Sequence, residues 1–151
     1  MESLLQSSKT IVLANYTTGT ANTVASSVLD LSAWVPGGCE GLYFQHVVCS
    51  TATTSAQVFT IQASATTAAA SFATVNKNST AMTLTVSTGF PFVSILDVQK
   101  PTYRYWRTVH TATGTAQAGA VICTAYGVRS FPTSNNSTYT PATMSAVSPS
   151  T

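Results

Sequence analysis

The chain has 151 residues, of which 44% are hydrophobic and only 7% are charged, whereas an ordinary soluble domain carries about 25% charged residues. This composition excludes a disordered chain, which would lack apolar residues to bury, and the net charge of +2 excludes the dense basic surface of a dedicated nucleic-acid-binding protein. Because a free monomer usually relies on charge of both signs to avoid sticking to its neighbours, we expect a packed β-protein built for assembly with other subunits.

Four β-favouring runs, separated by turn-like clusters, are predicted as strands in the first half of the chain. They cover residues 10–16, 23–31, 42–50 and 57–63, where Val, Ile, Thr, Tyr and Phe recur. The second run also spaces Val24, Val28 and Leu31 as a helical turn would, so strand and helix both remain open there. The sequence WVPGG at residues 34–38 predicts a turn. The run 57–63 alternates as a half-buried strand does, so one of its faces is expected to lie inward.

The second half continues the same pattern. Residues 65–70 could form a brief helix but are assigned to a loop of small residues. Residues 80–88 alternate most cleanly, with Met82, Leu84 and Val86 on one face, and are predicted as the best strand of the sequence. Further strands are predicted at residues 92–98, 102–111 and 118–128. The TGT sequence between the last two predicts an antiparallel hairpin at the centre of the fold.

Together these elements predict an all-β fold, with a single antiparallel β-sandwich domain over residues 1–129. Residues 130–151 differ in composition, because Ser, Thr, Pro and Asn dominate and large apolar groups are scarce. Phe131, Tyr139 and Met144 interrupt this tail as isolated apolar anchors. Such a segment can form an extended arm that lies on a neighbouring subunit. A disordered terminus is an equally good interpretation.

Three cysteines, Cys39, Cys49 and Cys123, are an odd number, which favours reduced thiols over a disulfide framework. A metal site could combine Cys39, His46 and Cys49 with Cys123 or His110. However, His46 and Cys49 are three residues apart and would project from opposite faces of a strand. No pair has the close spacing of a structural zinc site, so we expect neither a metal nor another cofactor.

The sequence offers little material for catalysis. His46 and His110 are the only histidines, and neither lies in a nucleophile-elbow, zincin or phosphate-loop pattern. The four carboxylates are scattered, so we expect the protein not to be an enzyme. A carbohydrate-binding module is an alternative, since aromatic side chains can stack on sugar rings. The residues considered for that role are Trp34, Tyr43, Trp106 and Tyr126.

The start of the chain resembles neither a signal peptide nor a membrane anchor. It lacks a basic segment followed by a long apolar run, and no apolar run approaches the roughly 20 residues of a membrane-spanning helix. We therefore expect the protein to be made in the cytoplasm of the cell that produces it.

Large aromatic and basic side chains are concentrated in the run 102–111, and these are the predicted partner contacts. Trp, Tyr and Arg dominate interface hot spots because they combine a large contact area with a polar group. The full set of predicted contact residues is Tyr103, Arg104, Tyr105, Trp106, Arg107, Arg129, Phe131 and Tyr139. Two alternatives remain open. Tyr105 and Trp106 can belong to the core, and the two arginines 104 and 107 can pair with Asp97.

Two segments near the end of the predicted sandwich resemble a known family. The sequence FVSILDVQKPTYRYWR at residues 92–107 is followed by AVICTAYGVR at residues 120–129. Together they resemble the C-terminal half of small cement or decoration proteins of tailed bacteriophage capsids. In those proteins an LDV-x-KP turn leads into an aromatic and basic strand, and a small-residue strand that ends in YG-x-R follows.

This resemblance implies a jelly-roll-like sandwich that binds the outer surface of an icosahedral phage head. The expected partners are the major capsid protein, whose subunit contacts it would reinforce, and further copies of this chain, with a trimer favoured. No direct contact with nucleic acid or a membrane is expected, and the expected location is the virion surface. Another virion role, such as a tail-tube or small coat protein, has the same composition and remains an alternative.

Overall fold

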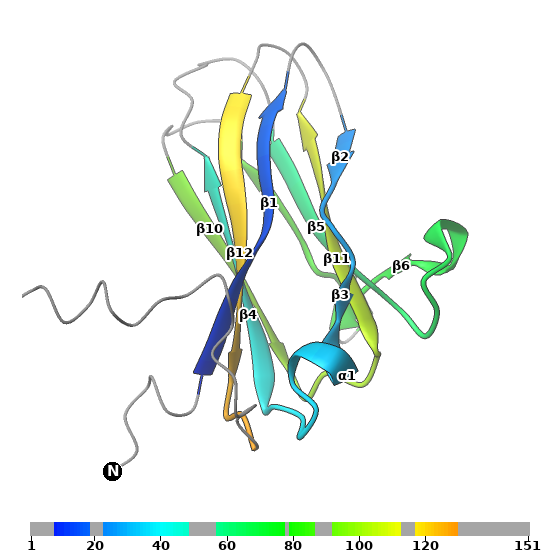
Figure 1. The fold of residues 1–151 in the computed structure, drawn as a ribbon. Coiled ribbons are helices and arrows are strands. Elements are labelled where there is room, and N and C mark those ends of the chain that lie inside the picture. The colour runs from blue at the N-terminus through cyan, green and yellow to red at the C-terminus, as the bar shows by residue number, and fades with distance from the viewer. Residues whose placement is uncertain are drawn as a thin grey trace, which may run out of the picture.

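The computed structural model describes residues 8–18, 23–48, 57–77, 79–86, 92–112 and 117–129. Antiparallel strands of these residues form two sheets that pack face to face (Figure 1), which confirms the predicted all-β sandwich. Sheet A contains, in order, β1 (Ser8–Thr18), β12 (Gln117–Tyr126), β4 (Gly41–Val48) and β10 (Phe92–Gln99).

Sheet B is centred on β11 (Tyr105–Ala112) and β5 (Gln57–Ser64), which pair with each other. On its far side β11 pairs with β2 (Thr23–Ala25) and β3 (Leu29–Asp30), and β5 pairs with β6 (Ala73–Thr74) and β9 (Thr83–Val86). A separate small ladder joins β7 (Asn76–Lys77) to β8 (Thr80–Ala81). The short helices are α1 (Leu31–Trp34) and the 3₁₀ helix η1 (Ala69–Ser71).

The core lies between the two sheets and follows the period-two alternation of their strands. In β4 every second side chain from Leu42 to Val48 is fully buried, and in β5 Phe59 and Ile61 point inward, as the alternation of residues 57–63 predicted. Phe44 of sheet A faces Trp106 of sheet B, with their ring centroids 6.3 Å apart. The contact of these large rings joins the two sheets.

The predicted hairpin of the last two strands is wrong. Strand β11 lies in sheet B, whereas β12 lies in sheet A between β1 and β4. A turn-like sequence predicts that the chain reverses direction, but it does not indicate which sheet the next strand joins. The prediction that these strands occupy central positions is confirmed, because each is an inner strand of its own sheet.

Two predicted strands are interrupted. The described part of the run 80–88 is divided at Met82, whose N–H donates to the Val75 carbonyl at 2.7 Å while its carbonyl accepts from Ile61 at 3.2 Å. Regular alternation in the sequence therefore did not ensure continuous pairing. The run 23–31 forms the short strands β2 and β3 and then enters α1. Asp30 ends that run because its carboxylate accepts from the backbone N–H of Ser32 and caps the helix.

Two histidines are buried together in the core. His46 is 0% exposed and His110 is 2% exposed, and their ring centroids lie 4.9 Å apart. His46 also stacks on Phe59, at 4.6 Å between ring centroids. Burial lowers the pKa of His46 to about 3, to which the neighbouring His110 adds a smaller contribution, and burial lowers the pKa of His110 to about 4. Both rings are therefore neutral in the folded protein at neutral pH.

We predict that acid destabilises the fold well above the pH at which carboxylates titrate. Below the ordinary histidine pKa of about 6.5, the unfolded chain takes up protons that the folded chain excludes. The free energy of unfolding should therefore fall by about 2 kcal/mol for each histidine between pH 7 and pH 5. Urea titrations at the two pH values measure this loss. The His110→Leu variant should show about half of it, and an unchanged pH dependence in that variant would contradict the assignment.

Candidate functional site

Charge is scarce in this chain, and most of it lies at one end of the sandwich. There β4 and β11 begin, β10 and β12 end, and α1 follows β3 (Figure 1). Seven of the ten charged residues of the sequence lie in this region, which we call the charged end. They are Lys9, Asp30, Glu40, Asp97, Lys100, Arg104 and Arg129.

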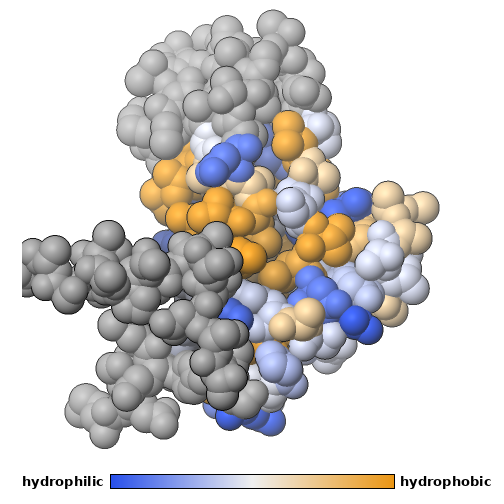
Figure 2. All heavy atoms as spheres, viewed as in Figure 1, coloured by the Kyte–Doolittle hydropathy of each residue, from blue (hydrophilic) through white to orange (hydrophobic). Residues whose placement is uncertain are grey.

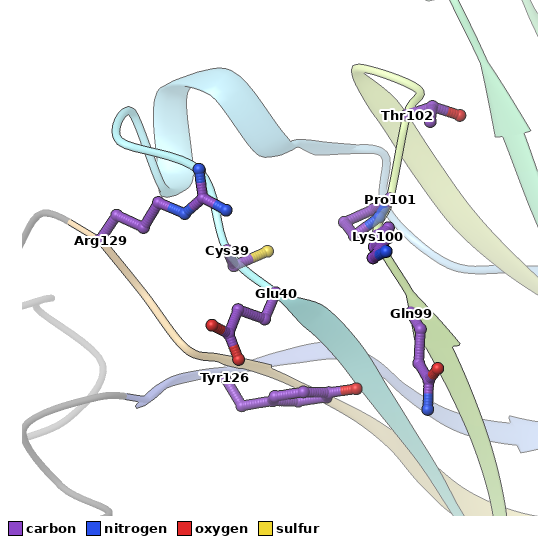
Figure 3. Close-up of a pocket in the computed structure, with 9 residues that line it drawn as sticks. Cys39, Glu40, Gln99, Lys100, Pro101, Thr102, Tyr126 and Arg129 are labelled. Atoms are coloured by element: carbon purple, nitrogen blue, oxygen red, sulfur yellow. The ribbon is translucent and has the colours of Figure 1, made fainter.

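An open pocket of about 560 Å³ lies at the charged end. In Figure 3 the side chains of Cys39, Glu40, Tyr126 and Arg129 lie along one side of it, and residues 99–102 lie along the other. The first side is formed by the loop before β4 and the end of β12, and the second by the turn that follows β10. Three segments that are distant in the sequence therefore form one site.

Backbone hydrogen bonds hold these segments in place. The N–H of Lys100 donates to the Glu40 carbonyl at 2.8 Å, and the N–H of Glu40 donates to the Tyr126 carbonyl at 2.9 Å. The N–H of Arg129 donates to the Gly38 carbonyl at 3.1 Å. Lys100 has a φ of 51°, a left-handed conformation that is uncommon for a residue with a side chain. It turns the chain sharply before Pro101, so the pocket wall is fixed by backbone geometry.

Tyr126 joins β12 to its neighbour β4 and to the next strand of sheet A, β10. Its ring lies directly over Gly41, so a Cβ atom at Gly41 would overlap the phenol ring. Its hydroxyl donates to the carboxylate of Asp97 in β10, at 2.9 Å. Burial and then this hydrogen bond raise the pKa of Tyr126 to about 12. The glycine at the start of β4 is therefore needed for the close approach of an aromatic ring.

The pocket offers fixed charges and hydrogen-bonding groups. Burial raises the pKa of the half-buried Cys39 thiol, so this thiol and the phenol of Tyr126 both keep their protons at neutral pH. Lys100 and Arg129 supply positive charge and Glu40 supplies negative charge from the pocket lining. Such an arrangement can bind polar and charged groups of a partner surface.

The alternative in which Arg104 pairs with Asp97 does not hold. Arg104 precedes β11 and pairs with Asp30, with 2.7 Å between Nη2 and Oδ2 and 3.0 Å between Nε and Oδ1. The reason is the topology, because β11 pairs with β3 and so places Asp30 beside Arg104. The guanidinium also lies 4.9 Å from the ring centroid of Tyr105. Asp97 belongs to the other sheet, where it accepts the hydrogen bond of Tyr126.

The predicted contact run divides into residues with different roles. Trp106 is 1% exposed and its indole N–H donates to the Tyr103 carbonyl at 2.7 Å, so its assignment as a partner contact is wrong and the core alternative holds. Tyr103 is 50% exposed at the charged end. Arg107 lies on the outer face of sheet B, where its guanidinium is 4.3 Å from the ring centroid of Phe72 and Nε donates to Gln62 at 2.8 Å.

The remaining predicted contacts divide in the same way. Tyr105 is half-buried beside Arg104, and Arg129 is exposed in the pocket lining. Phe131 and Tyr139 lie outside the described residues, as does the whole tail 130–151. Sequence reasoning did not single out Gly41 or Glu40 for the site, although a glycine at a strand start is a known signal of close approach.

The residues considered for a metal site are not assembled as a ligand set in the described part of the chain. Within that part no group of three or more His, Cys, Asp or Glu side chains could hold a metal ion. His46 and His110 lie together in the core, Cys39 and Cys123 are free thiols, and Cys49 lies outside the described residues.

Comparison with protein-family models, with curated protein sequences and with solved structures finds no match to this chain. Among the described residues, no helix has the length and hydropathy needed to cross a membrane.

We predict that Gly41→Ala destabilises the fold by about 1–3 kcal/mol, because the added methyl group overlaps the Tyr126 ring. Without that overlap, alanine would be favoured over glycine in a strand by about 0.5–1 kcal/mol. Chemical denaturation of Gly41→Ala, Tyr126→Ala and the double variant measures the coupling. In the Tyr126→Ala background the Gly41→Ala change should be neutral or stabilising. Equal destabilisation by Gly41→Ala in both backgrounds would show that the overlap with the Tyr126 ring is not its cause.

Proposed function

We propose that this protein is a virion structural protein, namely a cement or decoration protein that binds the outer surface of an icosahedral bacteriophage head. Its partners are the major capsid protein, whose subunit contacts it reinforces, and further copies of itself. In this proposal it is made in the host cytoplasm and resides on the virion surface. The proposal includes no catalytic step, no cofactor, no nucleic acid and no membrane.

The observation that carries the proposal is the division of the protein surface. Seven of ten charged residues gather at the charged end, where Tyr103, Lys100 and Arg129 are exposed. Charge spread over all sides would suit a solitary monomer. The exposed aromatic and arginine side chains at this end suit a contact surface for another protein, and its charges can orient a partner.

The resemblance to phage decoration proteins supports the same reading. Its first segment contributes Asp97 and Lys100 to the charged end, and its second segment contributes Tyr126 and Arg129. The two halves of the resemblance are therefore one site in space, joined by the Tyr126–Asp97 hydrogen bond.

The strand order supports the jelly-roll part of the proposal. If β2 with β3, and β6 with β9, are each counted as one strand, eight strands form the two sheets in the orders 1-8-3-6 and 2-7-4-5. Jelly rolls are double sheets of eight strands that contain two Greek keys, and they are common among viral capsid proteins and lectins. Fold alone does not assign a function, so the argument depends on the surface.

The alternative of a carbohydrate-binding module loses part of its basis. Trp34 and Trp106 are buried, at 7% and 1% exposure, so neither indole can stack on a sugar ring. Tyr43 and Tyr126 are partly exposed on sheet A. Two of the four residues considered for sugar stacking are therefore part of the core.

The charged end is predicted to carry the binding to the shell. We expect the wild-type protein to occupy stoichiometric, symmetry-related positions on accessory-free phage heads, as cryo-electron microscopy of the mixture would show. The double variant Lys100→Ala, Arg129→Ala should bind with at least about tenfold lower affinity, because two interfacial charges are removed. Both side chains are exposed, so its melting temperature should stay close to that of the wild type.

Arg107→Ala is the control for the loss of positive charge. This variant removes a guanidinium from the outer face of sheet B, and it should leave binding to heads unchanged. Reduced binding by Arg107→Ala alone would place the contact on sheet B, as the sequence first indicated. Absence of ordered wild-type protein on any head would contradict the proposed function itself.

A further inference from the structure

The outer face of sheet A carries a group of aliphatic side chains and is nearly free of charge. Alternate residues of its four strands point away from the core, and strand pairing places them in rows: Val93 beside Val47, and Ile122 between Gln45 and Val12. Figure 2, viewed as Figure 1, shows hydrophobic residues gathered over these strands. The apolar members of this face, which we call the sheet A face, are Val12, Val47, Val93, Ile95, Ala120 and Ile122.

Several of these side chains are strongly exposed. Val93 is 54% exposed, Val12 49% and Ile95 46%. Asp97 is the single charged residue among the described outward-pointing positions of β10, β4, β12 and β1, and it lies at the charged end. The other outward positions of these strands carry hydroxyl or amide groups, such as Thr10 and Thr124, whose Oγ1 atoms are 2.9 Å apart.

The outer face of sheet B differs. There Phe72 is buried beneath Arg107, and the carbonyl of Ala69 accepts a hydrogen bond from the same guanidinium at 3.3 Å. The excursion between β5 and β6 thus covers apolar surface on sheet B. Within the described residues, no comparable excursion lies across the sheet A face.

We propose that the sheet A face binds the same face of a second copy, which gives a two-fold symmetric dimer. A second copy presents an equally apolar surface and brings no like charge against the centre of the contact. In a two-fold contact each residue meets the symmetry-related patch of its partner, so one self-complementary face is sufficient. Twisted sheets can pack face to face in this way, as the two sheets of the sandwich already do.

The area of the face fits a reversible dimer. Four strands about 4.8 Å apart, with eight residues at about 3.3 Å each, give a face of roughly 500 Å². Two such faces bury roughly 1,000 Å² in total, which is near the lower limit for a specific protein interface. We therefore expect dimers that form at micromolar concentrations and dissociate on dilution.

This inference specifies the self-association that the proposed function includes, and it is tested without any shell. Analytical ultracentrifugation of the full chain over a concentration series should show a mass that rises from the 15.7 kDa of one chain toward twice that value. Val93→Lys combined with Ile95→Lys should weaken the dimer by about 100-fold or more, because the lysines would be buried without partners. Val12→Lys, at the other side of the face, is an independent second variant.

Val28→Lys is the matched control. Val28 is 42% exposed, and it lies in the segment between β2 and β3, which contributes no residue to the sheet A face. This variant should dimerise as the wild type does, and all variants should keep the wild-type melting temperature of the monomer. A wild type that stays monomeric at every concentration, or equal weakening by Val28→Lys, would overturn the proposal.

Two further outcomes would also overturn it. A trimeric mass would contradict the two-fold arrangement. A monomeric wild type whose binding to phage heads is lost in Val93→Lys, Ile95→Lys would assign the face to the capsid instead of to a second copy. Failure of shell binding with an intact dimer would leave this inference standing and would contradict the proposed function alone.

Discussion

Strand β4 links the core of the protein to two parts of its surface, the sheet A face and the charged end. Its inward side chains, from Leu42 to Val48, are fully buried, and Phe44 reaches Trp106 of the opposite sheet. Its outward side chains form the middle of the sheet A face, and its first residue, Gly41, accommodates the ring of Tyr126. One strand therefore contributes to the core, the sheet A face and the charged end. A shift of its register by one residue would turn its core side chains outward and its outward side chains into the core.

The division of the surface follows from a shortage of charge. With 7% charged residues, the chain cannot place solvated side chains on every side. The charged side chains are placed at the charged end, where three loops meet. Some of them also stabilise the fold there, since Asp30 caps α1 and Asp97 accepts the hydrogen bond of Tyr126. The sheets are left with hydroxyl and aliphatic side chains. A protein of this kind has an end that can form charge contacts and a face that can form apolar ones.

The sequence allowed the class of fold and most strands to be predicted, because alternation in segments such as residues 57–63 directly reflects burial on one side. Pairing between strands could not be predicted, since β11 and β12 are adjacent in sequence yet lie in different sheets. For the same reason the pairing of Arg104 with Asp30 could not be predicted, and Asp97 was considered instead. The aromatic and basic run also did not reveal that Trp106 points inward while Tyr103 stays exposed. The reason is that β11 begins only at Tyr105, so Tyr103 lies before the strand.

The position of β10 has a consequence for handling the protein. Among the described residues β10 pairs only with β4, so in this part of the chain its other side is an unpaired sheet edge, and its exposed residues Val93 and Ile95 carry no charge. Natural edge strands usually bear lysine, proline or a bulge that blocks the addition of a further strand. Val93 and Ile95 provide no such block, so misfolded or overconcentrated copies can extend the sheet there into aggregates. The yield of native protein would then depend on whether β10 is covered by its native partner before a strand of a misfolded copy pairs with it.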